Sequence, residues 1–212
     1  MSAPSRRRRS QHPVPAAQIA EFSRRMRHAM VDAITRFGDA GGDFAALTIE
    51  RAASPIAPAR MASQHAGAAE RQQAQALYER CLARYRAAVP APADAPELDD
   101  VGGAVARFVA ANLRALRGIE ATPAMLRKLE RQLIGIVRAS AGWAAESARE
   151  RQFYFEQMAI IAVLIDESFA RAAAEGPSAI ANVRSAARGY LHHFLGLNPD
   201  LLTLGTDGLQ AV

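Results

Sequence analysis

The chain has 212 residues, 50% of them hydrophobic and 6% aromatic, and this length suits one domain with an appendage while excluding two full domains. Alanine dominates the apolar residues, which favours closely packed helices over strands, since strands draw on β-branched and aromatic side chains. A single cysteine, Cys81, excludes an intramolecular disulfide and a cysteine-based zinc cage. We therefore predict an all-α protein: a single bundle of about five to six helices with a disordered basic N-terminal tail.

The net charge of +5 is concentrated at the N-terminus. Residues 1–36 hold eight arginines against Glu21 and Asp32, which gives +6, and residues 37–212 hold 18 basic and 19 acidic residues, which gives −1. Lys128 is the only lysine, and this arginine bias, with abundant Ala, Gly and Pro, indicates a GC-rich bacterial genome. The body of the chain therefore has no overall charge excess of the kind that indicates a nucleic-acid-binding surface.

Residues 1–15 form the first predicted segment, an Arg-rich tail with too little apolar surface to order itself. Its run Arg6, Arg7, Arg8 and Arg9 is a candidate contact for an anionic membrane or a nucleic acid, and we expect such binding only through this tail. The alternatives are a solvating tail and a misassigned start site. No apolar segment follows the arginines, so we expect a cytoplasmic location by default, with export or a periplasmic location open if the start is misassigned.

Residues 16–62 form the second predicted segment, an amphipathic helix followed by a linker. The helix carries an apolar stripe at spacings of three and four, made of Ile19, Phe22, Met26, Met30, Ile34 and Phe37. Pro55 and Pro58 predict an extended loop between this helix and the rest of the chain.

Residues 63–212 form the predicted helical bundle domain. Apolar periodicity predicts helices over about 63–88, 100–117, 122–142, 147–175 and 178–195. Thr122 and Pro123 mark one start as cap and first helical residue. The helix over 147–175 is apolar around nearly its whole circumference, so we expect it at the centre of the bundle. The leucines of the segment after Gly196 are expected to fold back on the helices.

Three side chains are candidates for a pocket between helices. Asn112 falls on the buried stripe of its helix, and Arg184 and Arg188 lie on the last helix, so a ligand between helices could contact all three. The alternative for Asn112 is a hydrogen bond to a neighbouring backbone carbonyl group. Cys81 also lies on an apolar stripe, where a small core residue is the expected role.

Motifs that would indicate catalysis or metal binding are missing from the sequence. Glu156, Asp166 and Glu167 could meet His192 and His193, but no Glu-x-x-His motif of a di-iron bundle occurs, and we expect Glu156 and Glu167 on an exposed edge. The sequence also lacks a Gly-x-Ser-x-Gly elbow and glycine-rich phosphate loops. We therefore predict no catalytic residues, no cofactor and no metal, and the protein is expected not to be an enzyme.

Three segments of the chain resemble an uncharacterised bacterial family of helical proteins, a domain of unknown function whose members are often exported. They are DVGGAVARFVAANLRAL, RQFYFEQMAIIAVLIDESF and SAARGYLHHFLGLNPDLLTLGTDGL, within roughly the last 110 residues. The resemblance implies a helical fold and no activity.

The sequence thus leaves two functions open. We expect a non-enzymatic helical module that interacts with a protein partner of unknown identity, in an envelope or secretion function. The alternative is a helical protein or enzyme that binds a small molecule in a pocket between helices.

Overall fold

The computed structural model describes residues 47–89, 97–139 and 141–211. Within these ranges lie seven α-helices: α2 (Ala57–Ala62), α3 (Ala68–Ala88), α4 (Val101–Arg117), α5 (Pro123–Ala139), α6 (Ala141–Ala145), α7 (Ala148–Glu175) and α8 (Pro177–Leu195). The all-α prediction is confirmed. The tail with Arg6 to Arg9 and the helix predicted from Ile19 to Phe37 lie outside the described residues.

Two short pairs of antiparallel strands accompany the helices. Strand β1 (Thr48–Glu50) pairs antiparallel with β2 (Leu98–Asp100). After the short 3₁₀ helix η1 (Pro199–Leu201), strands β3 (Leu202–Gly205) and β4 (Gly208–Ala211) form an antiparallel hairpin. The sequence analysis predicted neither pair, because three or four residues are too few for an alternating pattern to stand out.

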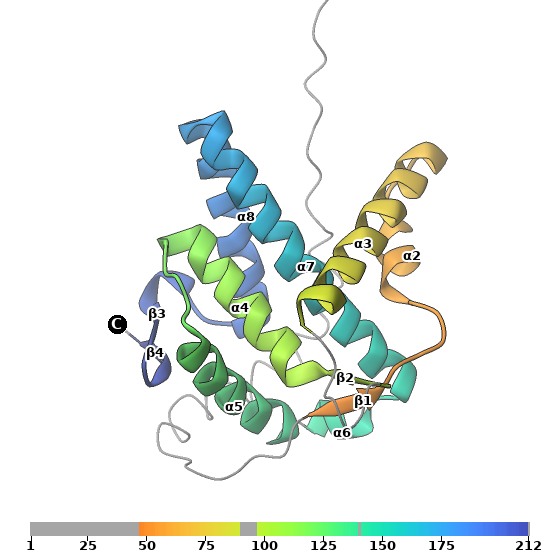
Figure 1. The fold of residues 1–212 in the computed structure, drawn as a ribbon, viewed down its shortest axis with the longest axis horizontal. Coiled ribbons are helices and arrows are strands. Elements are labelled where there is room, and N and C mark those ends of the chain that lie inside the picture. The colour runs from red at the N-terminus through yellow and green to blue at the C-terminus, as the bar shows by residue number, and fades with distance from the viewer. Residues whose placement is uncertain (1–46, 90–96, 140, 212) are drawn as a thin grey trace, which may run out of the picture.

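Helix α4 is the centre of the bundle. Of its 17 residues, 14 are buried, and it packs against α5, α7 and α8. Figure 1 shows α4 beside α7, with α5 and the C-terminal hairpin on one side and the α2–α3 pair on the other. Asp100 caps its first turn by accepting a hydrogen bond from the Gly103 N–H group, and Gly118 ends it with a φ of 73°.

Helix α7 is central only over its N-terminal half. Every residue from 152 to 162 is buried, in agreement with the central position predicted for this helix, but beyond Ile165 the only buried residue of the helix is Ala172. The C-terminal half of α7 diverges from α3 in Figure 1.

The structure differs from the predicted loop at residues 55–62. Pro58 lies in the first turn of helix α2 rather than in an extended chain, since a proline is compatible with the first turn, where its missing N–H group has no partner to lose. Ala57 and Met61 of α2 are fully buried. Residues 47–62 are therefore part of the packed structure.

The C-terminal leucines fold back on the helices in part. Leu202 and Leu204 are buried on the inner face of β3, whereas Leu201 is 55% exposed. Leu202 and Leu204 alternate with Thr203 along β3 and so share one face of the strand, whereas Leu201 belongs to the preceding 3₁₀ helix η1.

Candidate functional site

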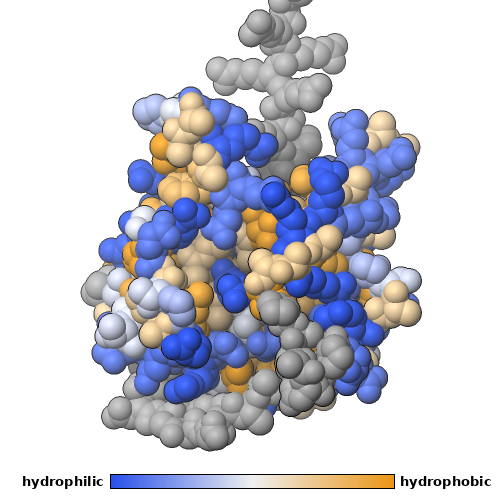
Figure 2. Space-filling view, in the orientation of Figure 1, coloured by the Kyte–Doolittle hydropathy of each residue, from blue (hydrophilic) through white to orange (hydrophobic). Residues whose placement is uncertain are grey.

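A pocket of about 270 Å³ opens between the C-terminal end of α3, the middle of α4, the start of α5 and the middle of α7. Most of its lining is small or aliphatic, including Ala88, Val89, Ala110, Ala111, Leu126 and Ala162. Figure 2 shows hydrophobic surface gathered near the region where α3, α4 and α7 meet. This volume lies just below the range of about 300–1,000 Å³ that is typical of small-molecule sites, so the pocket has room only for a ligand of a few heavy atoms.

The pocket is one of the places where solvent reaches the central helix α4. Arg107, Arg114 and Arg117 are the only residues of α4 that are not buried. Arg117 donates to the backbone carbonyl groups of Asp200 and Leu202, whereas Arg107 and Arg114 line the pocket. These two arginines are about two helical turns apart and therefore share one face of α4.

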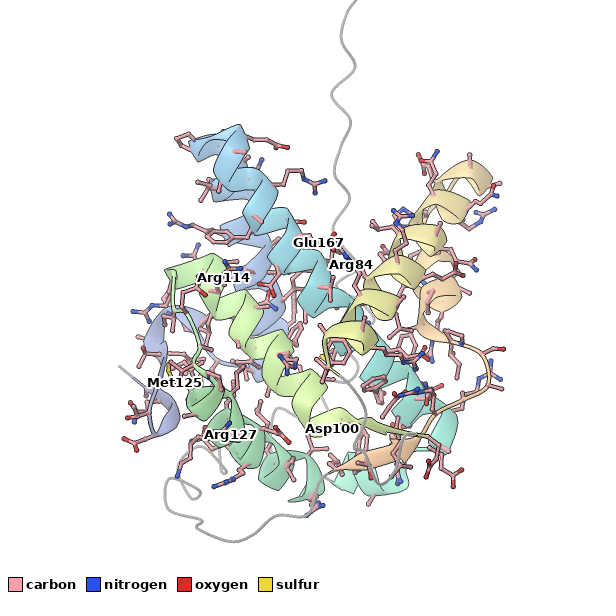
Figure 3. All side chains as sticks on the ribbon, in the orientation of Figure 1. Arg84, Asp100, Arg114, Met125, Arg127 and Glu167 are labelled. Atoms are coloured by element: carbon pink, nitrogen blue, oxygen red, sulfur yellow. The ribbon has the colours of Figure 1, made fainter. Side chains whose placement is uncertain are left out.

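Arg114 is held by two carboxylates of the pocket wall. Its Nε atom lies 2.7 Å from Glu120 Oε1 and its Nη1 atom 3.3 Å from Asp166 Oδ1. The hydrogen bond to Glu120 is the main reason why the pKa of Arg114 is raised. Burial raises the pKa of Asp166 more than Arg114 lowers it. Figure 3 shows Arg114 at the upper end of α4. The positive charge of Arg114 is balanced by the carboxylates of Glu120 and Asp166.

Tyr85 and Arg107 form the other polar part of the pocket. Tyr85 is 4% exposed and its hydroxyl oxygen is enclosed by the protein, with the Arg107 side chain beside it as a hydrogen-bond partner. Burial raises the pKa of Tyr85, and the nearby Arg107 guanidinium opposes part of that rise. Arg107 has no carboxylate at ion-pair distance in the described ranges, although Asp100 and Glu130 are close enough for its charge to lower their pKa values.

The three residues predicted to form a pocket are not brought together. Asn112 is fully buried and donates a hydrogen bond of 2.7 Å to the Phe108 carbonyl oxygen, which is the alternative that the sequence analysis gave for it. Arg184 is exposed on α8, and Arg188 pairs with Asp200 at 3.1 Å. None of the three lines the pocket described above.

Glu156 is not on an exposed edge, so that prediction is wrong. It is fully buried, and its Oε2 atom accepts hydrogen bonds of 2.7 Å from the N–H groups of Ile56 and Ala57 at the start of α2. Gln152 donates to its other oxygen, and Arg86 lies 3.7 Å from that oxygen. The sequence could not reveal this role, because the partners lie about 100 residues away in a segment predicted as a loop.

Glu167 does lie at an edge. It pairs with Arg84 of α3, and Figure 3 shows the two side chains between α3 and α7. Cys81 is 1% exposed, as expected of a core residue, and burial raises the pKa of its thiol to about 11. It is therefore neutral near pH 7 and poorly suited to nucleophilic attack.

The described residues offer neither a metal site nor a membrane span. They contain no group of three or more His, Cys, Asp or Glu side chains placed to hold a metal ion. Within the same ranges, no helix combines the length and hydropathy needed to cross a membrane.

The sequence analysis missed Tyr85, Arg107, Arg114 and Asp166 as site residues. One signal was present in the sequence: Asp100, Arg107 and Arg114 recur every seven residues along a helix that is otherwise almost entirely apolar. Charged residues at that spacing lie on one face of a helix. When the helix is otherwise buried, a charged face indicates the side on which no neighbouring helix covers it.

A model for a family of unknown function matches residues 11–211 of the chain. The match confirms the resemblance to a family of unknown function and extends it from the C-terminal half to almost the whole chain. No curated protein and no solved structure matches.

Proposed function

The chain belongs to DUF6683, a family of unknown function, and we propose that it is a non-enzymatic helical protein that binds a small molecule in the pocket between α3, α4, α5 and α7. One observation carries the proposal: the central helix, buried along 14 of its 17 residues, reaches solvent in this pocket through Arg107 and Arg114. A half-buried charge costs free energy unless it is paired. Arg114 is paired with Glu120 and Asp166, and Arg107 lies beside Tyr85, so the aliphatic wall of the pocket is the part that a ligand would cover.

The polar lining favours binding over catalysis. It consists of two arginines, two carboxylates and a tyrosine. Both carboxylates, Glu120 and Asp166, are engaged by Arg114, which disfavours proton transfer by either one because a general base must be able to reach its substrate. The aliphatic wall supplies area for an apolar ligand body.

A fragment screen on the full chain tests this proposal. The ¹⁵N-labelled protein is titrated with a set of small polar and apolar compounds, and amide shifts are followed by NMR spectroscopy. We expect at least one compound to shift the amides of Ala111 and Ala162 with a saturating dose response. The proposal is wrong if no compound shifts pocket amides in a folded sample, or if all saturating shifts map to other parts of the chain.

A protein-interaction module is the second candidate, with an envelope or secretion role as the sequence analysis expected. It is supported by α3, of whose 21 residues only Tyr78, Cys81, Leu82 and Tyr85 are buried. The first half of α3 is therefore a helical surface with little contact to the bundle, and helical surfaces of this kind are common contacts for partners.

Site-specific photo-crosslinking tests this second candidate. A photoreactive residue replaces Gln72, which is exposed on α3, and in a matched control it replaces Arg184, which is exposed on α8. We expect one protein to crosslink at position 72 and not at position 184, with excess unlabelled chain competing for it. Equal crosslinking at both positions would exclude a specific surface on α3.

A further inference from the structure

We infer that the ligand of this pocket is a short aliphatic amine, with its ammonium group at the rim beside Asp166 and Glu120 and its hydrocarbon body on the aliphatic floor. The inference rests on the proposed function, since it assigns a ligand class to the same pocket. Buried apolar side chains form the floor of the pocket, and half-buried or exposed carboxylates lie at its rim.

The floor of the pocket is made of small aliphatic side chains. Ala110 and Ala111 of α4 and Ala162 of α7 line the pocket and are buried. Their methyl groups offer no hydrogen bond, so only an apolar part of a ligand gains free energy by covering them. The volume of about 270 Å³ limits that part to a short hydrocarbon chain.

The rim supplies hydrogen-bond acceptors that the protein does not use. The side chains of Asp166 and Glu120 are 49% and 72% exposed, and each carboxylate gives one oxygen to Arg114. The second oxygen of each has no hydrogen-bond partner among the described residues. A carboxylate oxygen can only accept, so these two atoms call for a donor.

Negative charge is in excess at this end of the pocket. Arg114 is the ion-pair partner of both Glu120 and Asp166, and +1 − 2 gives −1 for the three side chains. The pKa of Asp166 is raised, mainly by burial and in part by the charge of Glu120, despite the neighbouring Arg114. A cation placed between the two carboxylates would offset this excess.

The second arginine of the lining, Arg107, does not reverse the balance. It lies beside the Tyr85 hydroxyl. Its charge also opposes the rise in the pKa of Asp100 and of Glu130, two carboxylates that do not line the pocket. An anionic ligand would therefore meet carboxylates at the rim and no arginine without a protein partner, whereas an ammonium group brings three N–H donors to the acceptors of the rim.

Four probes test the ligand class: isopentylamine, its neutral analogue isopentanol, the anion isovalerate, and methylamine, which lacks the branched body. Each is titrated into the ¹⁵N-labelled full chain at low salt. We expect isopentylamine to shift the amides of Ala111 and Ala162 and to bind about fivefold more tightly than isopentanol, the gain from one half-exposed ion pair. Isovalerate should bind more weakly than isopentanol, and methylamine should give no saturable shift.

Variants assign the ammonium contact to its acceptors. The readout is the ratio of the isopentylamine and isopentanol affinities within each variant, so that a general disturbance of the pocket cancels. Asp166→Asn should lower this ratio from about five to about one, and Glu120→Gln should lower it by about twofold. Glu175→Gln is the matched control, because it removes a carboxylate of the same helix outside the pocket, and it should leave the ratio unchanged. Far-UV circular dichroism confirms that each variant is folded.

The outcomes separate this inference from the proposed function. If isopentanol, isovalerate or methylamine binds in the pocket as tightly as isopentylamine, or if Asp166→Asn leaves the affinity ratio unchanged, the amine assignment is overturned and the small-molecule pocket stands. If isopentylamine does not bind while other fragments do, the result is the same. If neither these probes nor the fragment set shifts a pocket amide, the proposed function fails as well.

Discussion

A few buried polar residues hold together parts of the chain that are far apart in sequence. Glu156 of α7 binds the first N–H groups of α2. Asp99 of β2 is 3% exposed and pairs with Arg51 at 2.9 Å and with Arg86 at 2.7 Å. Such groups stabilise a fold only while their partners are present, because an uncompensated buried charge is costly.

Removal of the Glu156 side chain tests this role. Glu156→Ala leaves the N–H groups of Ile56 and Ala57 and the Gln152 side-chain amide without their acceptor, and we expect a loss of about 3–5 kcal/mol in the free energy of unfolding. Glu167→Ala is the control: it removes an exposed carboxylate paired with Arg84 and should cost no more than about 1 kcal/mol. Urea unfolding of both variants measures the difference, and equal losses would contradict the assigned role.

The buried carboxyl group of Asp100 should make the free energy of unfolding depend on pH. Burial raises its pKa above the ordinary value of 3.8, despite the opposing N–H groups of Gly103 and Gly102. The folded state therefore binds a proton more tightly than the unfolded state, so the contribution of Asp100 is most favourable at low pH and declines as pH rises through its folded pKa.

Asp100→Asn keeps a capping side chain and removes this titration. Wild type should therefore lose stability relative to Asp100→Asn as pH rises from about 4 to neutrality. Urea unfolding of both proteins across that range provides the test. A relative stability that rises with pH would reverse the predicted sign.

At the scale of the elements, helices with local end signals were predictable. Ser147 caps α7 by accepting from the Glu150 N–H group, and Gly176 followed by Pro177 separates α7 from α8. Such caps act within one turn and are visible in the sequence. The family resemblance covered the same helices and is confirmed over residues 11–211.

Elements that depend on distant partners were not predictable. Helix α2 is six residues long, too short to be stable alone, and it starts at N–H groups bound by Glu156. Likewise β1 requires β2, with the Val101 N–H group donating to the Leu47 carbonyl oxygen. The pocket also depends on tertiary packing. The sequence contains many arginines, so Arg107 could be singled out only once the structure showed that α4 is the central helix.

Close packing of α4 on α5 leads to a prediction for Gly102. A Cβ atom at this position would lie 2.6 Å from the Ile134 side chain, so Gly102→Ala should destabilise the protein by about 1–3 kcal/mol. Gly189→Ala in α8 is the matched control, since nothing lies within 4 Å of its added Cβ, and it should stabilise by about 0.5–1 kcal/mol. Thermal unfolding of both variants measures these changes in stability. A shift of the melting temperature in the same direction for both variants would contradict the close packing of Gly102 on Ile134.

At the scale of the whole molecule, charge divides the chain into two parts. Residues 1–36 carry +6 and residues 37–212 carry −1. The charge excess and the pocket thus belong to different parts of the chain.

The concentration of positive charge in residues 1–36 predicts that anionic membranes bind to the N-terminal part of the chain. Deletion of residues 1–15, which include Arg6 to Arg9, should abolish binding to vesicles rich in anionic lipid, and wild-type binding should weaken steeply as salt rises. Sedimentation of the protein with vesicles measures both. Equal binding by the truncated chain, or binding insensitive to salt, would place the contact elsewhere.

The central claim is that the pocket beside α4 is a ligand site, and blocking its mouth tests that claim most directly. Ala88 is exposed at the rim of the pocket, so Ala88→Trp fills the entrance with an indole ring while leaving the packed core unchanged. The measurement is the titration of this variant with the compound that binds most tightly in the fragment screen, followed by the amides of Ala111 and Ala162. We predict that the saturable shifts disappear while the free energy of unfolding stays within about 0.5 kcal/mol of wild type; undiminished binding of that compound by the folded variant would contradict the claim.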